Sequence, residues 1–178
     1  RLYRDGELVK MSKRRGTFVT LEELMEEVGQ EVARFFFSMR NPDSAMDFDL
    51  NLAKKESSEN PVYYVQYAHA RIVSILQATG LPTPRASEVD LTLLKAPEEI
   101  ALMEIMAKWT EEVTLAARDL APYRLPYYAK ELANTFHSFY NACKVLTDDE
   151  ALKNARLVLV DTTRITLRNV LKLIGVSA

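Results

Sequence analysis

The residues with the clearest chemical potential lie near the start of the sequence. Four cationic side chains fall within six positions and a glycine follows them, in the stretch Lys10-Met11-Ser12-Lys13-Arg14-Arg15-Gly16. Ammonium and guanidinium groups gathered on one loop can clamp a polyphosphate. A solvated basic loop would show the same charges, so the cations alone leave both interpretations open.

A short β-hairpin precedes the basic stretch and would present it. Two strand-like runs, at positions 1–4 and 7–9, flank the dipeptide Asp5-Gly6. Asp-Gly supplies the positive φ angles that a two-residue hairpin turn needs. The cations therefore follow the second strand directly. Their loop ends at Gly16, which would let it hinge.

Two helices are predicted after the loop. Thr20 and Glu23 have the spacing of a capping box at the start of the first helix, which Gly29 would end. The second helix, near 30–40, carries three consecutive phenylalanines. Three adjacent aromatic residues cover most of the circumference of a helix, so we expect this one to be buried between layers.

Apolar and polar residues alternate between positions 46 and 52, which predicts a short extended segment. Asp47 and Asp49 would then point to the same side. Paired carboxylates could form an acid/base pair or a cation site, but with no third ligand or nearby histidine they fit a solvated edge or partners of local arginines better.

The most informative helix is predicted near 61–78. Asn60 and Pro61 are typical of an N-cap and a first helical turn, and Gly80 would end the helix. One of its faces presents two phenols and a guanidinium at a spacing of four, from Tyr63, Tyr67 and Arg71. Rim packing and an RNA-stacking face both fit this pattern.

Three more helices complete the chain. They are expected near 97–120, near 126–145 and, after a capping box at Thr147 and Glu150, up to Ile174. His137 falls in the second of these and is predicted to lie at the surface or the rim. The last carries a row of cations that could be a solvated or a phosphate-tracking face: Arg156, Arg164, Arg168 and Lys172.

The composition limits the possible classes of protein. The chain has 178 residues, 48% of them hydrophobic, and a formal net charge of −2, so any RNA binding must come from a local patch. The single cysteine, Cys143, excludes an intramolecular disulfide and fits a reducing, cytoplasmic compartment. Two distant histidines argue against a zinc site, and no apolar run reaches transmembrane length.

The predicted fold class is mainly α. An antiparallel helical bundle over 58–178 is preceded, over 1–57, by the hairpin, the basic loop and a short α/β connection.

Three stretches together resemble the arginyl-tRNA synthetase family of bacterial type. The order Lys10-Met11-Ser12-Lys13 is similar to the ATP-gripping lysine loop of class I aminoacyl-tRNA synthetases. Residues 31–52 resemble the segment that links the catalytic and anticodon-binding domains, and residues 60–71 resemble the first helix of the anticodon-binding domain. The resemblance extends over essentially the whole chain. Because the matched segments are only the end of the catalytic domain and the anticodon-binding domain, we expect the chain to be a piece of a longer protein.

The resemblance implies an ATP-dependent ligation through arginyl-adenylate, with ATP as a substrate and Mg²⁺ as its companion. It assigns Lys10 and Lys13 as phosphate ligands, with Met11 and Ser12 completing the ATP-binding loop. It also implies an anticodon-binding bundle in which Tyr67 and Tyr140 stack on unpaired bases. The polar or phosphate contacts that it implies come from Arg71, Asn141 and Lys144.

The resemblance also limits what this chain does alone. The family's second ATP-binding element, similar to His-Ile-Gly-His, is absent from the sequence, as is most of the nucleotide-binding fold, so we expect no catalysis by this chain alone. The expected partners are arginine tRNA, ATP and arginine, with no membrane and a monomeric state. The alternative is a non-catalytic helical module that binds tRNA or another protein.

Overall fold

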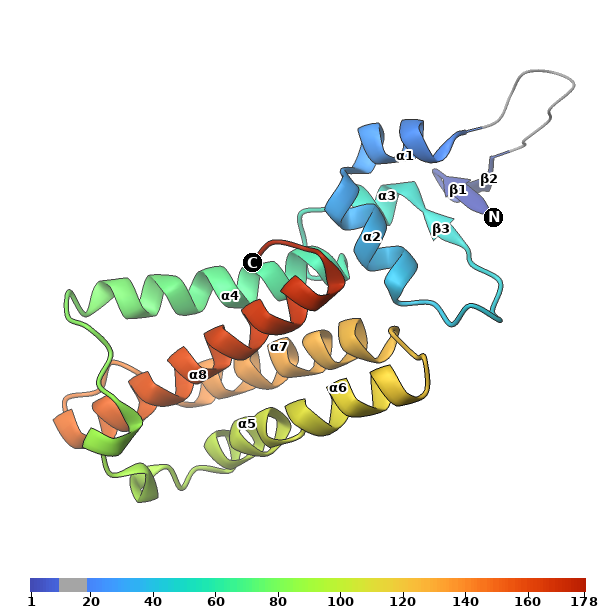
Figure 1. Ribbon diagram of the computed structural model, residues 1–178. Coiled ribbons are helices and arrows are strands. Elements are labelled where there is room, and N and C mark those ends of the chain that lie inside the picture. The colour runs from blue at the N-terminus through green and yellow to red at the C-terminus, as the bar shows by residue number, and fades with distance from the viewer. Residues whose placement is uncertain (10–18) are drawn as a thin grey trace, which may run out of the picture.

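The computed structural model describes residues 1–9 and 19–178. Figure 1 shows a small N-terminal part at one end of an elongated bundle of antiparallel helices. The N-terminal part contains β1 (Leu2–Arg4), β2 (Glu7–Leu8), α1 (Leu21–Val28), α2 (Gln30–Ser38), β3 (Phe48–Asp49) and α3 (Leu50–Lys54). The bundle contains α4 (Pro61–Ala78), α5 (Pro97–Ala107), α6 (Trp109–Arg118), α7 (Arg124–Ala142) and α8 (Glu150–Ile174). Two 3₁₀ turns, Ala86–Glu88 and Leu91–Leu93, lie between α4 and α5.

The predicted hairpin is confirmed. Strand β1 pairs antiparallel with β2 and parallel with β3, which gives the sheet order β2-β1-β3. Asp5 and Gly6 have φ angles of 53° and 77°, as a two-residue turn with positive φ requires. The hairpin therefore ends β2 at Leu8, two positions before the basic stretch begins in the sequence.

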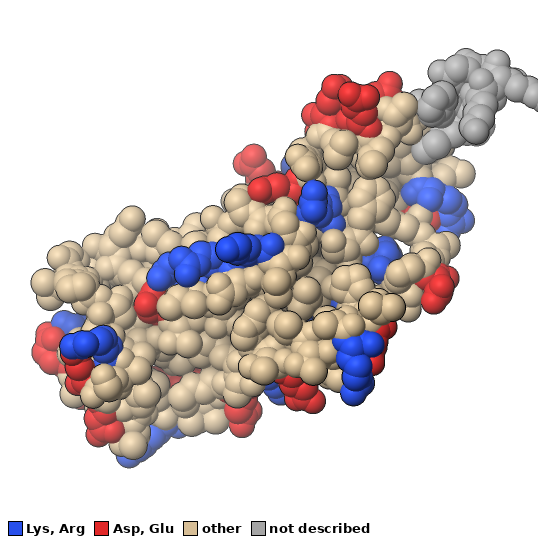
Figure 2. Space-filling model, in the orientation of Figure 1, with Lys and Arg blue, Asp and Glu red and all other residues tan. Residues whose placement is uncertain are grey.

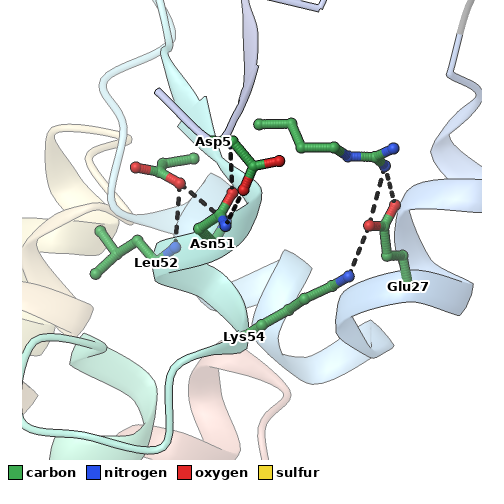
Figure 3. Close-up of polar contacts among 7 residues, drawn as sticks. Asp5, Glu27, Asn51, Leu52 and Lys54 are labelled. Atoms are coloured by element: carbon green, nitrogen blue, oxygen red, sulfur yellow. Dashed lines mark hydrogen bonds and ion pairs between the residues drawn. The ribbon is translucent and has the colours of Figure 1, made fainter. Parts of the chain in front are cut away.

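Exposed ionic contacts tie the hairpin to two helices (Figure 3). The carboxylate of Glu27 on α1 accepts hydrogen bonds from Arg4 on β1 and from Lys54 on α3, each at 2.7 Å. The hydrogen bond from Lys54 is the largest cause that lowers the pKa of Glu27. At the hairpin turn, Asp5 and Asn51 exchange two hydrogen bonds of 2.8 Å.

The extended segment predicted over 46–52 is wrong beyond Asp49. The Asp49 carboxylate caps α3 by accepting hydrogen bonds from the backbone N–H groups of Asn51 and Leu52, at 2.9 and 3.1 Å. Capping turns the chain into a helix one residue later. Asp47 instead pairs with Arg1 at 2.7 Å, which confirms the interpretation as a partner of a local arginine. The two carboxylates therefore have separate structural roles and do not form one site.

The three phenylalanines of α2 are not all buried. Phe35 and Phe36 lie in the core, but Phe37 is 42% exposed and contacts the ring of Phe48 at 5.6 Å. A helix at the edge of a domain buries one stripe of its surface, and the third residue of a consecutive run turns away from it.

The bundle core is formed where α7 packs between α4, α5 and α8. Its fully buried side chains include Val65, Ile72, Leu102, Leu132, Phe136, Phe139, Leu167 and Leu171. The helix predicted over 97–120 is divided at Lys108 into α5 and α6. No proline or glycine stands at the break. Beyond it, Trp109 places its ring 5.5 Å from that of Tyr128 on α7, so tertiary packing directs the second segment.

Helix α8 does not begin with the predicted capping box. Its N-cap is Asp149, whose carboxylate accepts hydrogen bonds from the N–H groups of Ala151 and Leu152. Thr147 lies outside the helix, because aspartate is the stronger capping residue and stands next to the first helical turn. The predicted end is confirmed, since Gly175 follows Ile174 with φ of 78°.

The N-terminal part and the bundle meet where α2 packs against α4 and α8, and the end of the chain adds hydrogen bonds there. Ser177 donates two hydrogen bonds to the Glu31 carboxylate on α2, at 3.0 and 2.8 Å. Its carbonyl oxygen accepts one from Gln66 on α4 at 3.1 Å. The division into 1–57 and 58–178 stays a prediction.

A buried ion pair joins α5 to α8. Glu99 is 1% exposed and accepts a hydrogen bond of 2.7 Å from Arg156 Nε. Its other oxygen accepts one of 2.8 Å from the N–H of Ala96, while Arg156 Nη1 donates to the carbonyl of Lys144 at 2.8 Å. The pair thus fixes α5, α8 and the turn between α7 and α8.

We expect Arg156→Ala to lower the free energy of unfolding by about 3 kcal/mol, because it leaves the Glu99 carboxylate buried without a countercharge. Urea unfolding at pH 7 measures this change. Arg118→Ala is the control, because it removes an arginine from an exposed pair with Asp119 and should leave stability nearly unchanged. An equal loss in both variants would contradict the structural role of the buried pair.

Candidate nucleic-acid interface

One arginine side chain lies between two tyrosine rings on the bundle surface. Arg71 on α4 places its Cζ 4.6 Å from the ring centroid of Tyr67 and 4.6 Å from that of Tyr140 on α7. Arg71 Nη2 also donates a hydrogen bond of 2.6 Å to the Tyr67 hydroxyl. These cation–π contacts and the hydrogen bond hold the guanidinium in place. The packing of α4 on α7 therefore brings together three residues that the sequence separates by up to 73 positions.

The two rings remain available to a partner. Tyr67 is 43% exposed and Tyr140 39% exposed, and Tyr63 stacks on Tyr67 with ring centroids 6.1 Å apart and planes 7° apart. Beside them is a hollow of about 430 Å³. It is lined by Ser58, Tyr63, Tyr64, Tyr67, Arg71, His137 and Asn141. Aromatic faces, a fixed cation and an amide at one hollow can stack a planar group and hydrogen-bond its edge.

His137 lies beneath this cluster, and the prediction that it sits at the surface or the rim is wrong. It is 9% exposed, its ring centroid lies 4.8 Å from that of Tyr64, and its Nδ1 is 3.5 Å from Arg71 Nη1. The pKa of His137 is lowered from its usual value, by burial first and by Arg71 second. A neutral imidazole can accept a hydrogen bond from Arg71, so His137 supports the arginine from below.

The spacing along α7 is the signal that could have identified His137. It lies three residues before Tyr140 and four before Asn141, so all three share one helix face.

The other predicted RNA contacts divide between two hollows. Asn141, which lines the first hollow, also lines a second hollow of about 600 Å³, together with Tyr140 and Lys144. Lys144 is exposed, while its backbone carbonyl is held by Arg156. The structure thus brings Tyr67, Arg71, Tyr140 and Asn141 together and places Lys144 next to them.

The predicted ATP-binding residues Lys10, Met11, Ser12 and Lys13 lie outside the described residues. In the ranges 1–9 and 19–178, no three His, Cys, Asp or Glu side chains are grouped as a metal site would need. Over the same ranges no helix has the length and apolarity to cross a membrane.

The helical bundle matches a known class of RNA-binding domain. A family model, the DALR anticodon binding domain, matches residues 65–178, and the chain belongs to this family. Comparison with individual proteins gives a narrower group of relatives than the domain family does. It is 56% identical to the arginine–tRNA ligase of Moorella thermoacetica and 55% identical to that of Heliobacterium modesticaldum, each over its whole length. These alignments span 32% and 33% of the two relatives, so the chain corresponds to about a third of their length.

Solved structures give the same result. A putative arginyl-tRNA synthetase from Campylobacter jejuni matches 99% of this chain and 38% of its own, with a TM-score of 0.88 and 30% identity. The arginyl-tRNA synthetase of Thermus thermophilus matches 93% of this chain and 28% of its own, with a TM-score of 0.74 and 32% identity. The resemblance drawn from the sequence and the mainly α fold class are confirmed.

Between pH 7 and pH 5 we expect the fold to lose stability as the pH falls. The pKa values of His137 and His69 are lowered in the folded chain, so near pH 6 the unfolded chain binds more protons. Stability is therefore full above the unfolded histidine pKa of about 6.5 and falls below it. Urea unfolding across this range measures the slope.

His137→Gln should reduce this slope, and His69→Gln should reduce it independently. The carboxylates with lowered pKa values act with the same sign but at lower pH, because their unfolded values lie near 4. A slope that is unchanged in the double variant would contradict the neutral state of both histidines.

Proposed function

We propose that this chain binds the unpaired anticodon bases of arginine tRNA at the cluster of Tyr67, Arg71 and Tyr140. The observation that carries the proposal is the Arg71 guanidinium held between two half-exposed tyrosine rings. Stacking on aromatic and guanidinium planes is how proteins hold single-stranded RNA loops. The family match and the named relatives support the choice of an anticodon and of arginine tRNA.

Each residue of the cluster has a distinct role in this proposal. The tyrosine rings stack on bases, and Arg71 offers its remaining N–H donors to a phosphate or a base edge. The Asn141 amide, which has both donors and acceptors, reads a base edge in the hollow. Lys144 neutralises a backbone phosphate next to Tyr140. His137 keeps Arg71 in position, so the cation needs little reorganisation when RNA arrives.

We further propose that the chain is the tRNA-binding part of an arginine–tRNA ligase, with residues 1–57 belonging to the end of the catalytic domain. In that enzyme ATP is a substrate, accompanied by Mg²⁺, and arginine is activated before transfer to tRNA. Lys10 and Lys13 stabilise the charge that develops on the phosphates, with Met11 and Ser12 beside them. The identity to arginine–tRNA ligases over the whole chain supports this proposal.

Tyr140→Ala should weaken the binding of arginine tRNA about fivefold to a hundredfold, because the loss of one base–aromatic stack costs about 1–3 kcal/mol. Tyr140→Phe should bind nearly as well as the parent, since it keeps the ring. Fluorescence anisotropy with labelled tRNA at fixed salt measures both.

Tyr127→Ala is the matched control. Tyr127 also lies on α7 and is 50% exposed, but it is remote from the cluster in sequence and lines a different hollow. Equal affinities for Tyr140→Ala and Tyr127→Ala, or no preference for arginine tRNA over another tRNA, would rule out the proposed site.

Lys13→Ala, introduced into the full-length enzyme, should slow arginine-dependent ATP–pyrophosphate exchange about a hundredfold. A cation aimed at developing phosphate charge contributes about 3 kcal/mol to the transition state. Arg15→Ala changes a neighbouring cation outside the Lys10–Lys13 motif and should have a much smaller effect. Undiminished exchange in Lys13→Ala would exclude the role given to this lysine.

A further inference from the structure

Two helical segments that lie side by side contain no acidic residues. Helix α4 packs against α8, and neither residues 61–78 nor residues 162–178 contain aspartate or glutamate. Helices α5 and α6, in contrast, carry five glutamates between them. A chain with a net charge of −2 thus has a positive face built on α4 and the second half of α8.

The cations of this half of α8 form a row, which we name the α8 strip: Arg164, Arg168 and Lys172. Their spacing of four residues separates successive side chains by a rise of about 6 Å. Figure 2 shows Lys and Arg atoms gathered in a band over the region where α4 and α8 lie together. Arg164 pairs with Asp161 at 2.8 Å, which marks the acidic end of the strip. Arg168 and Lys172 are exposed, and within residues 1–9 and 19–178 neither pairs with a carboxylate.

Arg156 does not belong to this row, although the sequence places it at the same spacing. It is turned into the buried pair with Glu99 and has a side chain that is only 13% exposed. The predicted line of four cations is therefore wrong for its first member.

The α8 strip faces α4 on the side opposite the tyrosine–arginine cluster. His69 of α4 lies in the field of Arg164 and Arg168, which lower its pKa after the larger effect of burial. Tyr67 and Arg71 lie on the flank of α4 that contacts α7. The two sets of cations thus lie on either side of one helix.

Between the α8 strip and the tyrosine–arginine cluster, the outer face of α4 carries small, uncharged side chains. Ala70 and Ser74 are both exposed there, and the Ser74 hydroxyl is turned back to donate to the Ala70 carbonyl at 3.1 Å. Small side chains without charge let a polymer pass close to the helix backbone. A long or acidic residue at either position would obstruct such a path.

We infer that the α8 strip binds the sugar–phosphate backbone of the RNA that flanks the unpaired bases, which crosses α4 over Ala70 and Ser74. The inference rests on the proposed function, because it takes the bases to be held at Tyr67 and Tyr140. Phosphate contacts from a regular row of cations position an RNA without reading its sequence. The strip therefore adds affinity for any RNA, while the cluster supplies selectivity.

The test uses the whole chain with Arg168→Glu and Lys172→Glu combined, and anisotropy with arginine tRNA from 50 to 300 mM salt. We expect about a tenfold or greater loss of affinity at low salt. The slope of log affinity against log salt should fall by about 1.5, since each lost phosphate contact removes about 0.7–0.9. The combined change Lys108→Glu and Lys130→Glu is the control, because it alters the charge equally at exposed positions away from the strip. Circular dichroism confirms that each variant is folded.

A second variant tests the path over α4. Ala70→Glu keeps a helix-forming residue and leaves the strip intact, yet should weaken tRNA binding by placing a carboxylate on this outer face. Ala70→Gln has a side chain of the same size without the charge, so comparing the two variants separates the effect of the negative charge from the effect of side-chain size.

The outcomes distinguish this inference from the proposed function. If the strip variant matches its lysine control in affinity and salt slope while Tyr140→Ala loses binding, the strip has no role and the base site stands. If the strip variant loses binding while Tyr140→Ala does not, the strip stands and the base site is wrong. A parent chain that binds no RNA overturns both.

Discussion

The buried carboxylate of Glu99 is the constraint on which the arrangement of the bundle depends. A charge that is 1% exposed requires a countercharge and hydrogen bonds, and Arg156 and the Ala96 N–H supply them. Because Arg156 also holds the Lys144 carbonyl, one guanidinium fixes the distance between α5, α8 and the end of α7. Sliding α8 by one turn would separate these groups. The pair thereby ties the segment that follows Tyr140 and Asn141 to α8.

The cluster of Tyr67, Arg71 and Tyr140 likewise depends on contacts between helices. Arg71 cannot be placed by α4 alone, since one of its two rings and its histidine support come from α7. The rings are rigid, the guanidinium is held from two sides, and burial and Arg71 lower the pKa of the histidine below, which favours its neutral form. If the proposed function holds, a cation held in this way loses little conformational freedom on binding RNA, which lowers the entropy cost of binding.

Local signals in the sequence predicted much of the fold. Asp5-Gly6, the Thr20–Glu23 box, Asn60-Pro61 and Gly175 each act through hydrogen bonds or φ angles within a few residues, and each of these predictions is confirmed. Most of the wrong predictions involve a partner that is distant in the sequence or a second residue that competes for the same role. The break at Lys108 follows packing of Trp109 on Tyr128, and Arg156 leaves its row because Glu99 attracts it. Asp149 caps α8 in place of the predicted Thr147. Asp49 caps α3 where an extended segment was predicted.

The candidate site was only partly visible for the same reason. The spacing of Tyr67 and Arg71 predicted one face, but periodicity within α4 contains no information about which residue of α7 approaches it. His137 was missed because a single histidine on a helix has no local pattern that indicates burial beneath an arginine. Residues 10–18 lie outside the described residues, so the basic loop stays a prediction from the sequence.

The contact at Ser177 has a mechanical consequence. Its hydrogen bonds to Glu31 and Gln66 join α2 to the first half of α4, near one end of a long rigid rod. Helix α4 has 18 residues and is about 27 Å long, so a pivot of about 10° at this joint displaces the far end by about 5 Å. Hydrogen bonds at this joint therefore resist only weakly a rotation caused by a force applied far along the bundle. A force on the distal half of α4 acts through a long lever arm on this joint, where α2 also packs against α4 and α8, so small rotations there become large displacements.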